Sequence, residues 1–114
     1  MSASPEFKSV TSRDNALLKD LRSLSRDNTA YRKLGRFWVE GEHLAQAALA
    51  RGRTPVLAVF AESFWAKAPT GLTQAAKLNV VIPDKLFDEI SGLESSAGMG
   101  FVLELPTILP MQSA

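Results

Sequence analysis

Apolar residues along the chain fall into two kinds of segment, one with helical spacing and one with short unbroken runs. Leucines recur at helical spacing between residues 17 and 24, which predicts an amphipathic helix that begins after a polar cap at Thr11 or Ser12. Later apolar runs are short and are bounded by glycine, proline and other turn-forming residues, as is typical of strands. The pattern predicts four strands, over residues 36–40, 56–60, 80–82 and 101–105.

Helices are predicted between these strands. Residues 42–51 and 83–90 have helical patterns, and the weaker region between them predicts a loop followed by a short helix near residues 72–78. Strands that alternate with helices at short spacing indicate an α/β fold. The same alternation predicts a largely parallel sheet, here of four strands. The run from Val56 to Phe60 is apolar throughout, so we expect this strand to be buried on both sides.

The length and composition are those of one small globular domain. With 114 residues, of which 46% are hydrophobic and 22% charged, the chain is long enough for one core and is not expected to be disordered. It contains no cysteine, which excludes disulfides and thiolate metal sites. No apolar run approaches the roughly 20 residues of a membrane span, and the N-terminus has no signal-peptide core, so we expect a cytoplasmic protein. We expect residues 1–7 to be a disordered or tag-like tail.

Charge is distributed unevenly along the chain. The net charge is +1, but residues 1–53 hold ten basic and six acidic residues, whereas residues 54–114 hold three basic and six acidic residues. Lys19, Arg22 and Arg26 recur at i, i+3 and i+7, so they share one face of the predicted helix, with Asn15 one turn earlier. Such a stripe is either the solvated face of a helix or a surface that follows the phosphate backbone of a nucleic acid.

A second basic group precedes the first predicted strand. Arg32, Lys33 and Arg36 flank a loop, where core packing does not account for basic side chains and where functional residues are common. Phe37 and Trp38 alternate across the strand, so one ring points into the core and the other is freer. A ring that faces the basic loop would be placed to stack on an unpaired base, and the alternative is that both rings belong to the core.

The order of particular residues forms a further pattern over most of the chain. The segment FWVEG, from Phe37 to Gly41, follows the basic loop and precedes an Ala/Leu-rich helix. The other positions of the pattern are Thr11, Ser12, Asn15, Lys19, Arg32, Gly35, Arg36, Val59, Phe60, Ser91 and Gly100. In this order the chain resembles, over residues 8–106, the N-terminal substrate-binding domain of the SpoU–TrmH family, which comprises RNA 2′-O-ribose methyltransferases of the SPOUT class.

The resemblance implies a fold and a function. The fold would be a three-layer α/β/α sandwich like that of a ribosomal protein that binds kink-turn RNA. Residues 8–106 would be an RNA substrate-binding domain for structured RNA, with rRNA favoured over tRNA. Residues 107–114 would be a truncated linker to a missing C-terminal knotted domain, which carries the catalysis and binds S-adenosylmethionine. None of the family's cofactor-binding segments occurs in this sequence. We therefore expect the chain alone to bind no cofactor, to be inactive and to be monomeric, and the full-length enzyme to be a homodimer.

The resemblance and the charge pattern together identify candidate RNA-binding residues, and they identify no catalytic or metal-binding residue. Glu40 either pairs with an arginine and orients it, or accepts a hydrogen bond from a ribose 2′-hydroxyl. His43, the only histidine, has no aspartate or cysteine at ligand spacing and is expected in the first turn of a helix. The candidate RNA-binding residues are Arg13, Asn15, Lys19, Arg22, Arg32, Lys33, Arg36 and Glu40.

Two other classes of function stay open. One is a stand-alone RNA-binding protein of the ribosomal or kink-turn type, against which the linker-like tail PTILPMQSA is the main argument. The other is a small regulatory α/β domain that binds a metabolite at the strand ends. That function requires a convergent polar pocket, and the acidic C-terminal half suggests none.

Overall fold

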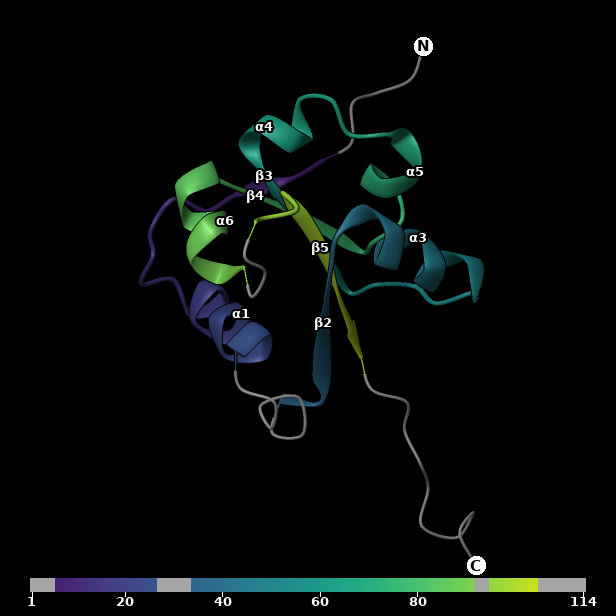
Figure 1. Ribbon diagram of the computed structural model, residues 1–114, viewed down its shortest axis with the longest axis horizontal. Coiled ribbons are helices and arrows are strands. Elements are labelled where there is room, and N and C mark those ends of the chain that lie inside the picture. The colour runs from purple at the N-terminus through teal and green to yellow at the C-terminus, as the bar shows by residue number, and fades with distance from the viewer. Residues whose placement is uncertain (1–5, 27–33, 92–94, 105–114) are drawn as a thin grey trace, which may run out of the picture.

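The computed structural model describes residues 6–26, 34–91 and 95–104. Strands and helices alternate through most of these ranges, as Figure 1 shows. In chain order the described elements are β1 (Lys8–Ser9), α1 (Ala16–Arg26), β2 (Arg36–Glu40), α3 (Glu42–Ala50), β3 (Leu57–Ala61), α4 (Glu62–Trp65), α5 (Thr70–Thr73), β4 (Leu78–Ile82), α6 (Asp84–Ile90) and β5 (Met99–Glu104).

The strands form one mixed sheet in the order β1-β4-β3-β5-β2. β4 pairs in parallel with β1 and β3, whereas β5 pairs antiparallel with β3 and β2. The prediction of a largely parallel, four-stranded sheet was therefore wrong in both respects. β1 is a two-residue edge strand with exposed side chains, so it has no apolar pattern to reveal it. β5 runs antiparallel to β3 because the chain enters β5 at the end of the sheet where β3 finishes. At this end the carbonyl of Gly98 accepts a hydrogen bond from the backbone N–H of Ala61 at 2.8 Å.

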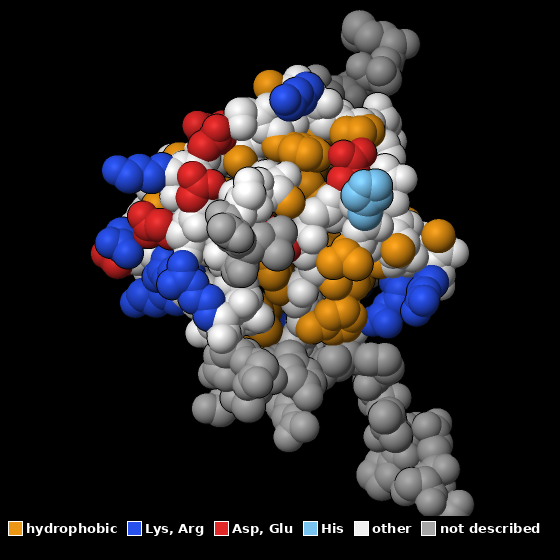
Figure 2. All heavy atoms as spheres, viewed as in Figure 1, with side chains coloured by type: hydrophobic (Ala, Val, Ile, Leu, Met, Phe, Trp, Pro, Cys, Tyr) orange, Lys and Arg blue, Asp and Glu red, His pale blue; other side chains and the backbone are white. Residues whose placement is uncertain are grey.

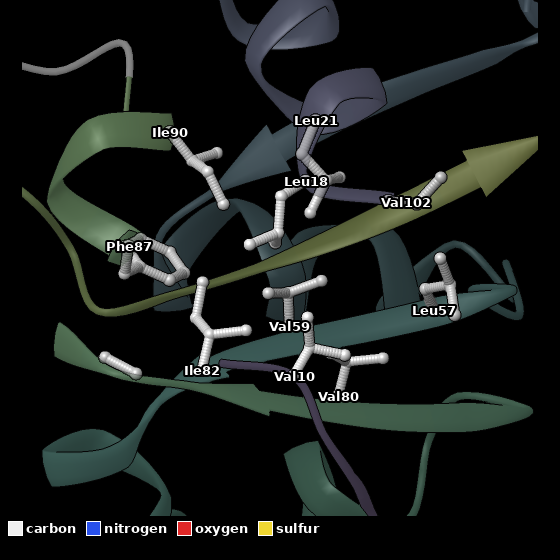
Figure 3. Close-up of a cluster of buried hydrophobic side chains, with 11 residues drawn as sticks. Val10, Leu18, Leu21, Leu57, Val59, Val80, Ile82, Phe87, Ile90 and Val102 are labelled. Atoms are coloured by element: carbon white, nitrogen blue, oxygen red, sulfur yellow. The ribbon is translucent and has the colours of Figure 1, made fainter. Parts of the chain in front are cut away.

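Helices cover both faces of the sheet, so the predicted three-layer α/β/α arrangement is confirmed. Side chains alternate between the faces along each strand, which supplies two separate cores. Figure 3 shows the first core, between the sheet and helices α1 and α6. It contains Val10, Leu18, Leu21, Leu57, Val59, Ala61, Val80, Ile82, Phe87, Ile90 and Val102. The second core, under α3 and α5, contains Ala45, Ala58, Phe60, Leu72, Val81, Met99 and Phe101.

The helix α1 begins later than predicted. Its cap is Asn15, whose side-chain Oδ1 accepts a hydrogen bond from the backbone N–H of Leu17 at 2.8 Å. The Asn15 carbonyl accepts the first helical hydrogen bond, from Lys19, at 3.1 Å. The backbone N–H of Asn15 donates to the carbonyl of Ser12, so Thr11 and Ser12 lie in the turn that leads to the cap.

The segment between β3 and β4 also differs from the prediction. The structure has two four-residue helices there, α4 and α5, and Leu78, the last residue of the helix predicted near 72–78, is the first residue of β4. The other predicted strands and helices lie within about two residues of their observed bounds, which is the usual scatter at element ends. Gly41 joins β2 to α3 with a φ of 106°, a conformation that favours glycine, as expected for this tight turn. Among the described helices, none is long and apolar enough to cross a membrane.

Candidate nucleic-acid interface

The outer face of α1 carries the predicted basic stripe. Lys19 is exposed and Arg22 is half-buried, and within the described ranges neither side chain contacts an acidic group. Figure 2 shows Lys and Arg side chains gathered over α1, with Asp and Glu side chains beside them toward α6. Asn15, one turn before Lys19, is occupied as the helix cap. The cations of α1 that are available to an anionic ligand are therefore Lys19 and Arg22.

The other two cations of this region are held by the C-terminal end of α6. Arg13 forms a salt bridge through Nη2 with Oε1 of Glu89 at 3.1 Å, and the Arg13 side chain is 65% exposed. Arg26 donates from Nη2 to the backbone carbonyl of Glu89, and Ser25 donates to the carbonyl of Ile90. Carbonyls at the C-terminal end of a helix attract cations, so these contacts dock α1 on α6. An exposed salt bridge contributes little to stability, which leaves Arg13 able to exchange its partner.

Arg36 lies on the other side of α1 from the stripe. It is the first residue of the edge strand β2, and its side chain is exposed. Together with Asp20 it lines a hollow of about 210 Å³ between α1 and the sheet. The remaining lining is apolar and consists of Leu17, Leu21, Leu24, Leu34, Leu57 and Val102. An acidic side chain therefore faces the hollow that Arg36 lines, and among the described residues Arg36 is not continuous with the basic stripe of α1.

Glu40 ends β2 and is buried, with 9% of its surface exposed. Its Oε1 accepts a hydrogen bond from the indole Nε1 of Trp38 at 3.3 Å. Its Oε2 accepts hydrogen bonds from the backbone N–H of Ala97, at 3.2 Å, and from the hydroxyl of Ser91. These contacts tie β2 to the end of α6 and to the turn before β5, which supports a structural role. The proposed pairing with an arginine and the proposed contact with a ribose stay predictions.

The two aromatic side chains of β2 point to opposite faces of the sheet, as the alternation predicts. Trp38 packs against the first core, and its ring centroid is 6.0 Å from the ring centroid of Phe87. Phe37 lies on the other face, where the guanidinium of Arg53 is 5.4 Å from its ring centroid. Trp38 is therefore the inward ring, and one side of the freer ring, Phe37, is occupied by a cation.

Comparisons with known proteins identify the fold. No family model and no curated protein matches the chain. Among solved structures, an AdoMet-bound rRNA methyltransferase from Sinorhizobium meliloti matches with a TM-score of 0.67 and 20% identity, over 95% of this chain and 40% of that one. An RNA 2′-O ribose methyltransferase matches with a TM-score of 0.67 and 22% identity, over 90% of this chain and 39% of that one. The SpoU methyltransferase AviRb from Streptomyces viridochromogenes, in complex with AdoMet, matches with a TM-score of 0.65 and 18% identity, over 85% of this chain and 38% of that one.

This chain has the fold of one part of the SpoU-type methyltransferases. The predicted resemblance to the SpoU–TrmH enzymes is therefore confirmed at the level of the fold. The chain spans about 40% of the length of the enzymes that it matches.

Within this SpoU-type fold, the structure brings only some of the candidate residues together. Arg13, Lys19 and Arg22 lie along α1 and the turn before it, and Arg36 is separated from them by the width of the helix. Arg32 and Lys33 lie outside the described residues. His43 is exposed in the first turn of α3, as predicted, and no group of acidic or histidine side chains among the described residues is arranged to hold a metal ion.

Sequence reasoning missed the residues that organise this surface. Glu89 holds Arg13 through its side chain and Arg26 through its carbonyl, although it is more than 60 positions away from Arg26 in the chain. Arg53 was counted only in the charge of the N-terminal half. The charge pattern alone was a signal for Arg53, whereas nothing in the sequence links Glu89 to α1.

Proposed function

We propose that this chain is the RNA-recognition domain of an S-adenosylmethionine-dependent RNA 2′-O-ribose methyltransferase. The supporting observation is the asymmetric match to the SpoU-type enzymes. The fold covers 85–95% of this chain but only 38–40% of theirs, so more than half of each enzyme lies outside the match. In this proposal residues 8–106 form the recognition domain, and residues 107–114 lead to a C-terminal domain that binds S-adenosylmethionine and transfers the methyl group.

The proposed RNA contacts begin on α1. Lys19 and Arg22 are free to meet phosphates, because neither contacts an acidic side chain in the described part of the chain. Arg13 joins them by exchanging Glu89 for a phosphate, which is also an anionic hydrogen-bond acceptor. Contacts of this kind fix the position of an RNA but do not read its sequence. We infer that α1 holds structured RNA, rRNA rather than tRNA, and that Arg32, Lys33 and Arg36 extend the contact past the end of the helix.

In this proposal the recognition domain positions the RNA, and the C-terminal domain carries out the methyl transfer. The recognition domain would hold the RNA so that one ribose 2′-hydroxyl reaches the second domain, where S-adenosylmethionine supplies the methyl group. Glu40 and its hydrogen-bond partners would act indirectly and not touch the RNA, since they set the position of β2 and thus of Arg36. A stand-alone RNA-binding protein is not favoured, because the three structural neighbours above are all methyltransferases.

Charge reversal on α1 tests this proposal. Binding of a structured, kinked RNA to the 114-residue chain is measured against salt concentration for the native protein and for Lys19→Glu, Arg22→Glu and Lys67→Glu. Each phosphate contact adds about 0.9 to the slope with which the logarithm of the affinity falls as the logarithm of the salt concentration rises. Relative to about 1 M salt, one contact therefore contributes about eightfold in affinity at about 0.1 M salt. We expect losses of at least that size for Lys19→Glu and Arg22→Glu.

Lys67 is the matched control, because it is an exposed lysine that follows α4 on the opposite face of the sheet from α1. We expect Lys67→Glu to bind RNA like the native chain. Equal losses for Lys67→Glu and Lys19→Glu would show that the attraction is a general effect of charge and would contradict the placement of the interface. Native protein without salt-dependent RNA binding would contradict the proposed function itself.

A further inference from the structure

In the folded chain, basic and acidic residues lie at opposite ends of the sheet. The uneven distribution of charge along the sequence does not show this arrangement. β2, β3 and β4 begin at one end, and β5 finishes there, since Arg36 pairs with Glu104 and Leu57 pairs with both Leu78 and Val102. The described charged residues at this end are Arg36, Arg51, Arg53, Lys77, Glu104 and Asp20, which lines the same hollow as Arg36. The opposite end, where β2, β3 and β4 finish, carries Glu40, Glu42, Glu62, Asp84 and Lys85. One end of the sheet is therefore basic and the other acidic.

Arg53 is held in a defined orientation at the basic end. Its guanidinium lies over the ring of Phe37, 5.4 Å from the centroid, and its Nη2 donates to the backbone carbonyl of Glu104 at 2.9 Å. A guanidinium has five N–H donors, so one hydrogen bond leaves several donors for another acceptor. An arginine whose plane is already fixed loses less freedom when it binds a phosphate through two of those donors. The contacts of Arg53 thus prepare it to bind an anion.

Arg51 is less easily explained by the fold. It lies just after α3, where its backbone N–H donates to the carbonyls of Ala47 and Ala48, and its side chain is exposed. No described acidic side chain forms a salt bridge with it. Figure 2 shows a separate gathering of Lys and Arg side chains beside α3, away from the group over α1. The molecule therefore has a second basic surface, on the α3 side of the sheet.

We propose that Arg51 and Arg53 form a second contact with the phosphate backbone of the RNA, separate from the stripe on α1 and reached from it across Arg36. This inference rests on the proposed function. β2 is the edge strand, so only one strand separates Arg36, on the α1 side, from Phe37 and Arg53, on the α3 side. A backbone that leaves α1 and crosses the start of β2 meets Arg36 first, and then Arg53 and Arg51.

The chemistry of this surface fits RNA better than a protein partner. Among the described residues its charged side chains are mostly cations, and the ring of Phe37 beside them is already covered on one side by Arg53. Interfaces between proteins are depleted in charge at their centre, whereas nucleic-acid interfaces are strongly positive. In this arrangement Phe37 is a positioning residue, because it fixes the plane of the Arg53 guanidinium.

The test compares Arg51→Glu, Arg53→Glu and Arg53→Lys with Lys67→Glu in the same RNA titration. We expect Arg51→Glu and Arg53→Glu each to weaken binding by about eightfold at about 0.1 M salt, and to reduce the salt slope by about 0.9. Arg53→Lys keeps the charge but loses the planar fork, so it should weaken binding by a smaller factor and leave the slope nearly unchanged. Lys67→Glu should leave both quantities unchanged.

Arg51 keeps the test independent of folding, because its side chain is exposed and Arg51→Glu should melt at the native temperature. If Lys19→Glu weakens RNA binding but Arg51→Glu and Arg53→Glu do not, the second contact is refuted while the proposed function stands. If Arg53→Glu lowers the melting temperature without changing the affinity of the folded protein, Arg53 has only a structural role and the inference also fails. If the native chain binds no RNA, the proposed function fails first.

Discussion

Gly100 offers the sharpest test of how the edge strand is held, because it lies directly beneath the indole of Trp38. A Cβ atom at position 100 would be 2.4 Å from Cη2 and from Cζ2 of Trp38, and 2.9 Å from Cζ3. Carbon atoms in favourable contact are about 3.5–4.0 Å apart, so the ring has to move by about 1 Å to admit a methyl group. Gly100→Ala should therefore destabilise the fold through Trp38.

The expected size follows from three effects. Overpacking of this kind costs about 1–3 kcal/mol. Displacement of the ring also breaks its hydrogen bond to Glu40, which is 3.3 Å long in the native structure, and a hydrogen bond of this kind contributes about 1 kcal/mol. Alanine is favoured over glycine in a strand by about 0.5–1 kcal/mol, which acts in the opposite direction. Gly100 has no positive φ, so backbone strain adds nothing. We expect a net loss of about 2 kcal/mol.

Urea unfolding of four chains measures this effect: the native protein, Gly100→Ala, Trp38→Leu and the double variant. If the indole is the cause, Gly100→Ala should lower the free energy of unfolding in the native background and should be neutral or stabilising in the Trp38→Leu background. The coupling between the two changes is then about 2–3 kcal/mol. An equal loss in both backgrounds would refute the reasoning, because the cost would not come from the contact with Trp38.

Three further predictions concern the cap of α1, an acidic side chain and the cofactor. Asn15→Ala should destabilise the chain by about 1 kcal/mol in thermal unfolding, because it removes the hydrogen bond to the N–H of Leu17, and Asn15→Asp should retain most of the native stability. Hydrogen bonds from Ser63 lower the pKa of Asp84 below 3.8. The stability that Asp84 contributes should thus be present above pH 3.8 and be lost as the pH falls through its lower folded pKa, and Asp84→Asn should remove this dependence. Calorimetric titration of the 114-residue chain with S-adenosylmethionine should show no binding at micromolar concentration, and micromolar affinity would contradict the assignment as a recognition domain alone.

Much of the fold was predictable, because local patterns carry it. The strand over residues 36–40 and the helix over 42–51 were predicted almost to the residue, since a change of hydrophobic period and the glycine at position 41 mark the boundary between them. The direction of β5 was not predictable, because it depends on where the chain returns after α6. β1 could not be found either, since it is an edge strand whose Lys8 and Ser9 are exposed.

The candidate site was predictable only as a set of charges. The helical spacing of Lys19 and Arg22 placed both on one face, and that placement needed no tertiary information. Two tertiary contacts changed the role of their neighbours: Glu89 holds Arg13, and the α6 carbonyl holds Arg26. The second basic surface, with Arg53 stacked on Phe37, arises from residues that are distant in the sequence and meet only in the folded sheet.

The most direct test of the central claim is to map the RNA contact on the folded chain by nuclear magnetic resonance. Backbone amide shifts of the isotopically labelled protein are followed while a structured RNA is added at low salt. The proposal predicts that the largest changes lie in α1, around Lys19 and Arg22, and at the start of β2, around Arg36, and that they diminish as salt is added. Changes confined to α4 and α5, or no change with any structured RNA, would contradict the assignment of this chain as an RNA-recognition domain.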